Sequence, residues 1–146
     1  MGAPELPTTV LQGGRRKAYR PLSESDRAAA FRAGVAAYEA GRFFEAHEHL
    51  EPAWMGTADS AERNFHQGLI KLAAAYVHAG RGNPLGIVKN LRGARERLAA
   101  AMAGGADSRG LDLEALVRDV DERLERLARS PDVVDLDPPP LHRRSA

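Results

Sequence analysis

The chain lacks cysteine, has few aromatic residues and contains no long apolar run. The absence of cysteine among its 146 residues excludes disulfides, iron–sulfur clusters, thiolate-bound zinc and a cysteine nucleophile. No apolar run approaches the roughly 20 residues that span a bilayer. The first 22 residues also lack the apolar segment of a signal peptide. Together these absences predict a cytoplasmic protein without a membrane segment.

The charge balance argues against nucleic acid as the partner. The chain has 21 basic and 20 acidic residues, which leaves a net charge of +1 and little general attraction to phosphates. Aromatic residues make up only 5% of the chain, so few side chains could stack on bases. Residues 15–20 hold four basic side chains that could touch a phosphate backbone or an acidic partner, but a solvated arm explains them as well.

The composition divides the chain into one domain with two flanking segments. Residues 1–21 hold three prolines, several glycines and no periodic apolar pattern, and they predict a flexible basic arm. Residues 131–146 contain three consecutive prolines, which cannot continue a helix, and they predict a disordered proline-rich tail. Residues 22–130 are therefore expected to form a single domain of ordinary size.

This domain shows helical periodicity and no alternating strand pattern. The apolar spacing predicts helices over about 23–40, 42–55, 60–79, 84–103 and 113–130. Residues suited to cap helix N-termini precede four of them: Ser23, Asp59, Asn83 and Asp112. The third helix is apolar over the widest arc and should be central, whereas Pro52 should kink or loosen the second. The fold class is all-α, a compact bundle of about five helices with flexible N- and C-terminal segments.

The second helix carries an unusual ionisable pair. His47 falls near the middle of the apolar stripe, and Glu51 lies one turn later, about 40° away. Trp54 lies one further turn along the same side. An ionisable pair aimed into a core must be hydrogen-bonded, paired or bound to a metal. Three interpretations remain open: a structural hydrogen bond, a divalent-metal site at His47 and Glu51, and acid–base chemistry in a small pocket.

Neighbouring polar residues could complete such a site. Glu48 lies beside the pair on the second helix, and His66 and Gln67 occupy the third helix, which could face it. Each also has a purely structural interpretation, as a packed histidine or an exposed polar side chain. Gly68 removes a side chain in mid-helix, which indicates either the close approach of another helix or room for a ligand.

These residues carry a resemblance to a known family. Residues from Phe43 to about Leu98 resemble the "domain of unknown function 309" family, which is marked by H-x-x-x-E-x-x-W. That motif corresponds here to His47, Glu51 and Trp54. A second segment, F-x-Q-G-L-I-x-L-A-A, corresponds to residues 65–74, and a later G-N corresponds to Gly82 and Asn83. The usual G-A that follows reads Gly86-Ile87 here. The resemblance implies a small, soluble all-α protein without an established function.

Two hypotheses follow from the residues and the resemblance. In the first, His47, Glu48, Glu51, Trp54, His66 and Gln67 form a polar pocket between the second and third helices that binds a divalent metal or a small polar ligand. In the second, the motif only fixes the packing of these helices, and another surface binds a partner. The many leucines are also compatible with a homodimer. The sequence assigns no reaction to the chain.

Overall fold

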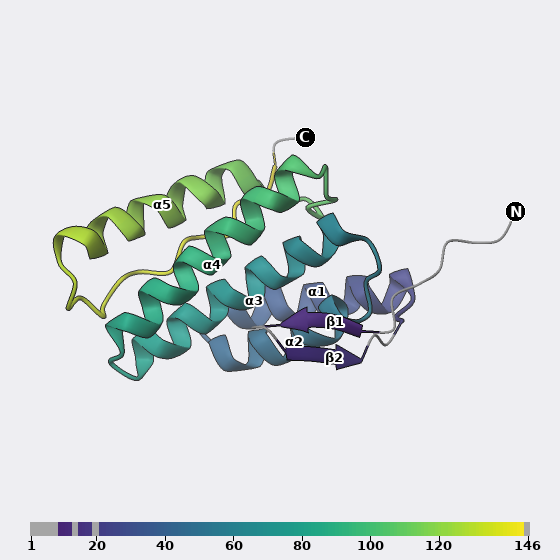
Figure 1. The fold of residues 1–146 in the computed structure, drawn as a ribbon, viewed down its shortest axis with the longest axis horizontal. Coiled ribbons are helices and arrows are strands. Elements are labelled where there is room, and N and C mark those ends of the chain that lie inside the picture. Colours follow the sequence, from purple (N-terminus) through teal and green to yellow (C-terminus); the bar gives the residue numbers. More distant parts are fainter. Residues whose placement is uncertain (1–8, 13–14, 19–20, 145–146) are drawn as a thin grey trace, which may run out of the picture.

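A computed structural model describes residues 9–12, 15–18 and 21–144, and these residues contain five helices (Figure 1). The helices are α1 (Glu24–Glu39), α2 (Phe43–Met55), α3 (Ser60–Gly80), α4 (Pro84–Ala103) and α5 (Leu113–Arg129). The predicted all-α bundle of five helices is confirmed. Two short strands, β1 (Thr9–Gln12) and β2 (Arg15–Ala18), pair antiparallel. The sequence pattern did not predict them. The rest of the predicted arm, apart from Pro21, lies outside the described residues.

Four helices begin at the capping residues that the sequence predicts. The side-chain oxygens of Ser23, Asp59, Asn83 and Asp112 each accept a hydrogen bond from the backbone N–H three residues later, at 2.9–3.2 Å. Each bond satisfies one of the N–H groups that a helix leaves unpaired at its start. Helix α2 begins without a side-chain cap, directly after the tight turn at Gly41. Local sequence chemistry thus explains most of the helix boundaries.

Helix α3 is the centre of the bundle. It packs against α2 and against α4, while α1 packs on α2 and α5 on α4. The apolar positions that the sequence assigned to its main stripe, Phe65, Leu69, Leu72 and Tyr76, are all buried. Its predicted central place is therefore confirmed, because a helix with apolar residues over a wide arc needs neighbours on two sides.

Gly68 allows a close approach between α3 and α4. A Cβ atom at this position would lie 2.7 Å from the side chain of Leu98 and 3.2 Å from its backbone nitrogen. Of the two explanations that the sequence left open, the structure shows the close approach, since Leu98 fills the space beside the glycine. Gly68 therefore does not leave room for a ligand.

Replacing Gly68 with alanine is therefore expected to lower the free energy of unfolding by about 1–2 kcal/mol, measured by urea denaturation. The crowding against Leu98 should outweigh the gain of about 1 kcal/mol that alanine brings to a helix. Gly80→Ala is the matched control, because a Cβ atom there would meet nothing within 4 Å. Equal losses in the two variants would contradict the packing argument.

Helix α2 continues through its proline. It runs from Phe43 to Met55 and includes Pro52 in its last turn. Proline has no N–H, so the carbonyl of Glu48 cannot receive the usual helical hydrogen bond from position 52. The N–H of Gly56 then bonds to the carbonyl of Pro52 at 2.9 Å. The proline loosens the helix by removing one donor but does not end it.

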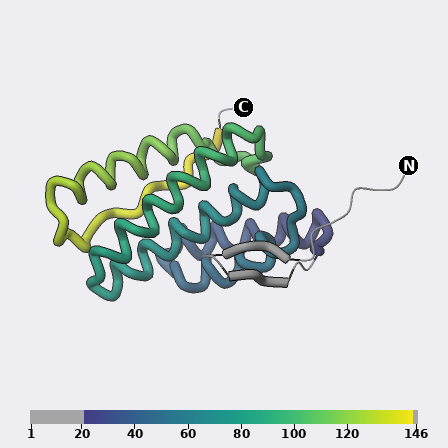
Figure 2. The backbone as a smooth tube through the Cα atoms, in the orientation of Figure 1, coloured from purple at the N-terminus to yellow at the C-terminus, as the bar shows by residue number. Residues whose placement is uncertain are grey.

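The C-terminal residues correct the prediction of a disordered tail. Residues 131–144, here called the strap, leave α5 and run back along the bundle as an extended segment (Figure 2). Leu136 and Leu141 are buried. Tyr38 of α1 and Tyr76 of α3 donate hydrogen bonds to backbone carbonyls of the strap. The prediction was wrong for these residues because the strap's apolar positions follow no regular period and its partners are distant in sequence.

No helix among the described residues could cross a membrane. The longest, α3, has 21 residues, and charged side chains such as Glu62 and Lys71 interrupt its apolar positions.

Candidate functional site

His47 and Glu51 lie on adjacent turns of α2, at the border between its buried and exposed faces. Their closest approach is 3.8 Å, between His47 Nδ1 and Glu51 Oε2. This distance is too long for a hydrogen bond but allows an ion pair when the histidine is protonated. The side chains are 29% and 25% exposed. The sequence placed His47 near the middle of the apolar stripe, whereas the structure places it at the edge of that stripe.

The ring of His47 is covered on one side by Phe44. The two rings lie nearly parallel, with an angle of 14° and 6.2 Å between their centroids. The Nδ1 atom of His47 is shielded from solvent and makes no hydrogen bond within the described part of the chain. A shielded ring nitrogen of this kind is available to an ordered water or to a ligand.

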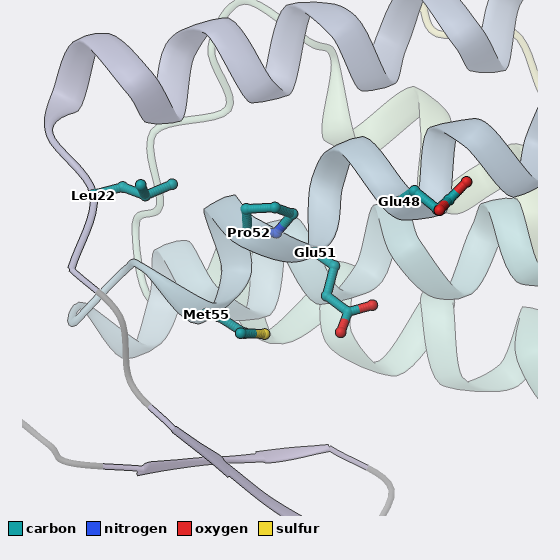
Figure 3. A pocket seen from close by; sticks show the side chains of 5 residues that line it. All are labelled: Leu22, Glu48, Glu51, Pro52 and Met55. Atoms are coloured by element: carbon teal, nitrogen blue, oxygen red, sulfur yellow. The ribbon is translucent and has the colours of Figure 1, made fainter.

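An open pocket lies beside this pair, on the exposed face of α2 (Figure 3). Its cavity measures about 330 Å³, and the described residues that line it are Leu22, Glu48, Glu51, Pro52 and Met55. The four residues from α2 share a face because each of them lies three or four positions from two others. Glu48 and Glu51 supply negative charge, and the other three residues supply apolar surface. Two of the six predicted site residues therefore meet at this pocket, and His47 adjoins Glu51.

Trp54 belongs to the core and not to this pocket. Its side chain is 1% exposed and packs in the main apolar cluster with residues such as Leu50 and Phe65. The sequence placed Trp54 close to His47 along the helix, and it lies two turns later in α2. The structure directs it inward, however, and it is not among the described residues that line the cavity.

His66 and Gln67 are also buried, on α3. They are 0% and 4% exposed, and neither is among the described residues of the pocket. Both ring nitrogens of His66 and the Nε2 atom of Gln67 have no hydrogen-bond partner in the described residues. Burial, together with the smaller effect of the charges of Arg109 and Arg27, lowers the pKa of His66 to about 4. His66 is therefore neutral at pH 7.

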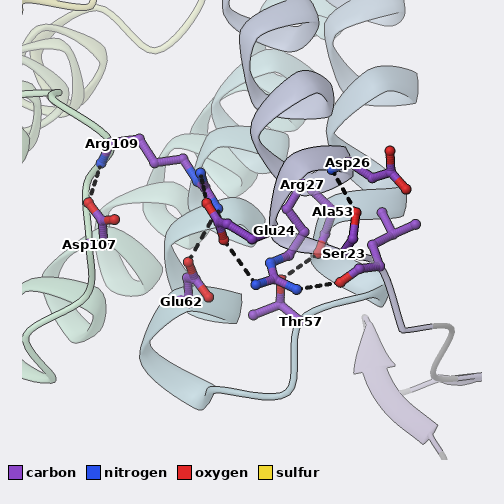
Figure 4. Close-up of polar contacts among 10 residues, drawn as sticks. Ser23, Glu24, Asp26, Arg27, Ala53, Thr57, Glu62, Asp107 and Arg109 are labelled. Atoms are coloured by element: carbon purple, nitrogen blue, oxygen red, sulfur yellow. Dashed lines mark hydrogen bonds and ion pairs between the residues drawn. The ribbon is translucent and has the colours of Figure 1, made fainter.

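A group of charged residues near His66 was missed by the sequence analysis (Figure 4). Arg109, in the loop between α4 and α5, binds Glu24 of α1 through two nitrogens at 2.8 and 3.2 Å, and Glu62 of α3 at 3.4 Å. Glu24 also pairs with Arg27 at 2.9 Å. The backbone at Arg109 has a φ of 51°, and its N–H bonds to Asp107. No local pattern could reveal this group, because Arg109 and Glu24 are 85 residues apart.

The described residues contain no cluster of three or more histidine, aspartate or glutamate side chains arranged to hold a metal ion. His47 and Glu51 would supply two ligands to a divalent ion, and a protein site for zinc takes at least three. The pair alone is a weaker basis for a metal site than for a contact with an organic ligand.

Comparison with known proteins agrees with the resemblance seen in the sequence. Residues 31–90 match the family described as "Domain of unknown function (DUF309)". This chain carries a DUF309 domain. No curated protein and no solved structure matches the chain.

The DUF309 domain includes all six predicted site residues. It begins in α1, spans α2 and α3 completely and ends within α4. Leu22, Arg109 and the strap lie outside it. The pocket on α2 is therefore formed mainly by the DUF309 domain, whereas the strap and α5 complete the bundle around it.

Proposed function

We propose that this protein binds a small organic cation in the pocket on α2. The observation that carries the proposal is the cavity of about 330 Å³, which is lined by two glutamates and three apolar residues. Small-molecule sites of proteins measure about 300–1,000 Å³ and combine apolar walls with a few polar groups that orient the ligand. The set of residues that lines the pocket fits a ligand with a charged end and an apolar body.

The polar side chains of the pocket are hydrogen-bond acceptors, which favours a ligand that carries hydrogen-bond donors. The carboxylates of Glu48 and Glu51 can accept charge-assisted hydrogen bonds from an ammonium or guanidinium group. The backbone carbonyl of Glu48 lacks its usual helical donor, since Pro52 has no N–H. An anionic ligand would meet two like charges here and is disfavoured.

The apolar groups define the other end of the ligand. Leu22, Pro52 and Met55 line the cavity beside the carboxylates. Methionine adapts to ligands of different shape, because its side chain is unbranched and polarisable. His47 lies beside Glu51 at the border of the pocket, with 3.8 Å between Nδ1 and Oε2. An amine or guanidine with a short hydrocarbon chain matches this arrangement better than a bare metal ion does.

Calorimetric titration with putrescine and agmatine, against the uncharged 1,4-butanediol, tests this proposal. We expect the two cations to bind and the diol not to bind. Glu48→Gln should weaken binding about tenfold or more, because a hydrogen bond to a charged group contributes about 1.5–3 kcal/mol. Glu45→Gln is the control, since it removes the same charge from α2 at a residue that pairs with Arg42 outside the pocket. Equal binding of the diol, or equal loss in both variants, would contradict the proposal.

A second candidate function assigns the motif to helix packing alone. The burial of Trp54, which is 1% exposed, favours a packing role for this residue. The partial exposure of His47 and Glu51 supports a ligand-facing role for these two instead. The stability measurements described in the Discussion separate the two candidates.

A further inference from the structure

We propose that the groove occupied by the strap also accepts the strap of a second copy of this chain, so that two chains exchange these segments and form a dimer. The groove is formed by side chains of α1, α3 and α5, and the strap crosses all three. A second copy carries a segment that fits the groove because it is identical. This inference concerns a different face from the pocket on α2 and does not depend on it.

The helices hold the strap largely through its main chain. Tyr38 donates to the carbonyl of Pro139 at 2.7 Å, and Tyr76 donates to the carbonyl of Asp137 at 3.0 Å. Arg123 donates from Nε to that same carbonyl at 3.0 Å. Donors on a rigid surface that bind the carbonyls of an extended segment are typical of peptide recognition. All three donors would form the same hydrogen bonds with the strap of another copy.

Side chains of the strap add specificity. Leu136, Pro139 and Leu141 are buried, whereas the prolines on either side of Pro139 are exposed. The Asp137 carboxylate binds Nη2 of Arg123 at 2.8 Å. A proline-rich segment loses little conformational freedom on binding, because its φ angles are already restricted. The strap therefore has the properties of a preorganised peptide ligand.

Leaving the groove empty would destabilise the folded protein, because buried donors in it would lose their hydrogen-bond partners. Tyr38 and Arg123 are buried, and without the strap their donors would lose protein partners. Burial raises the pKa of Tyr76 to about 12, so its hydroxyl remains a protonated donor across the physiological range. If a strap leaves its own groove in a dimer, the strap of the other copy must therefore fill that groove. Reciprocal exchange of the two straps meets this requirement.

The connection between α5 and the strap has the features of a hinge. Ser130, Pro131 and Asp132 are exposed. One backbone hydrogen bond, from Val133 to the carbonyl of Ser130 at 3.2 Å, closes the turn. Opening this turn costs few contacts, while both arrangements keep the same strap contacts in the groove. They differ mainly in the hinge and in the entropy of association, so the dimer should increase with protein concentration.

Shortening the hinge tests the exchange in the full-length chain. Deleting Pro131 and Asp132 should prevent a strap from turning back into its own groove without preventing it from reaching a second copy. We expect the wild type to form a dimer fraction that rises with concentration, and the deletion variant to be mainly dimeric. Light scattering after gel filtration measures mass, and circular dichroism checks that the helices remain.

Variants of the strap contacts show whether the strap makes the dimer. In the deletion background, Tyr76→Phe and Arg123→Gln should each raise the dimer dissociation constant several-fold or more. Arg129→Gln, which changes an exposed arginine of the same helix, should leave it unchanged. A monomeric deletion variant, a dimer insensitive to Tyr76 and Arg123, or loss of helical content on deletion would overturn the proposal.

Discussion

Replacing Trp54 with alanine is expected to lower the free energy of unfolding by about 3–5 kcal/mol. The side chain is 1% exposed and lies in the main core cluster, so its removal leaves a large cavity among side chains from several helices. Urea denaturation followed by circular dichroism measures the loss. If the domain is too unstable to purify, Trp54→Phe should give a smaller loss in the same direction.

The matched variants are His47→Ala and Glu51→Gln, on the same helix. Each should cost less than about 1 kcal/mol, because the pair is partly exposed and its two nearest atoms are 3.8 Å apart. This contrast would show that one motif serves two purposes, with Trp54 packing the core and Glu51 lining the pocket beside His47. Losses of several kcal/mol in all three variants would instead favour the packing function and remove the basis of the proposed ligand site.

Lowering the pH from 7 to 4 is expected to remove about 3 kcal/mol of stability through His66 alone. Its pKa is about 4 in the folded protein against 6.5 ordinarily, because the ring is buried and lies near the charges of Arg109 and Arg27. The unfolded chain therefore binds more protons than the folded one between pH 6.5 and 4. This contribution is complete above pH 6.5 and is lost progressively as the pH falls through that window.

His66→Gln is the control for this pH dependence. The variant should be less sensitive than the wild type between pH 6.5 and 4, because glutamine does not titrate. The difference between the two stability curves isolates His66 from carboxylates such as Glu24, whose pKa is lowered chiefly by its hydrogen bond to Arg109. Titration of the His66 ring by NMR gives an independent measurement. A His66 pKa near 6.5, with parallel curves for both proteins, would contradict the argument.

Local chemistry accounts for how well the helices could be predicted. Ser23, Asp59, Asn83 and Asp112 act within their own first turns, so their effect can be read from three or four neighbouring residues. The same holds for the regular apolar stripe of α3. Residues 65–76 show it without reference to any other part of the chain.

The site was predicted only in part, because periodicity does not determine where a helix border falls. His47 and Trp54 occupy neighbouring directions on α2, and the sequence treats them alike. The packing of α2 on α1 and α3 buries the tryptophan and leaves the histidine partly exposed. Burial likewise separates His66 from the pocket, although both helices were expected to contribute to it. The contribution of Leu22 to the cavity depends on where the chain enters α1.

The helical class could be predicted from the amino-acid sequence alone, as could the number of helices, four of the caps and the residues of the family motif. These properties depend on interactions between residues a few positions apart. Three features depend on how the helices pack: the bonds of Arg109 to Glu24 and Glu62, the pocket on α2 and the position of the strap. Tyr38 and Pro139 are 101 residues apart, and a contact over that distance exists only once the helices between them are packed.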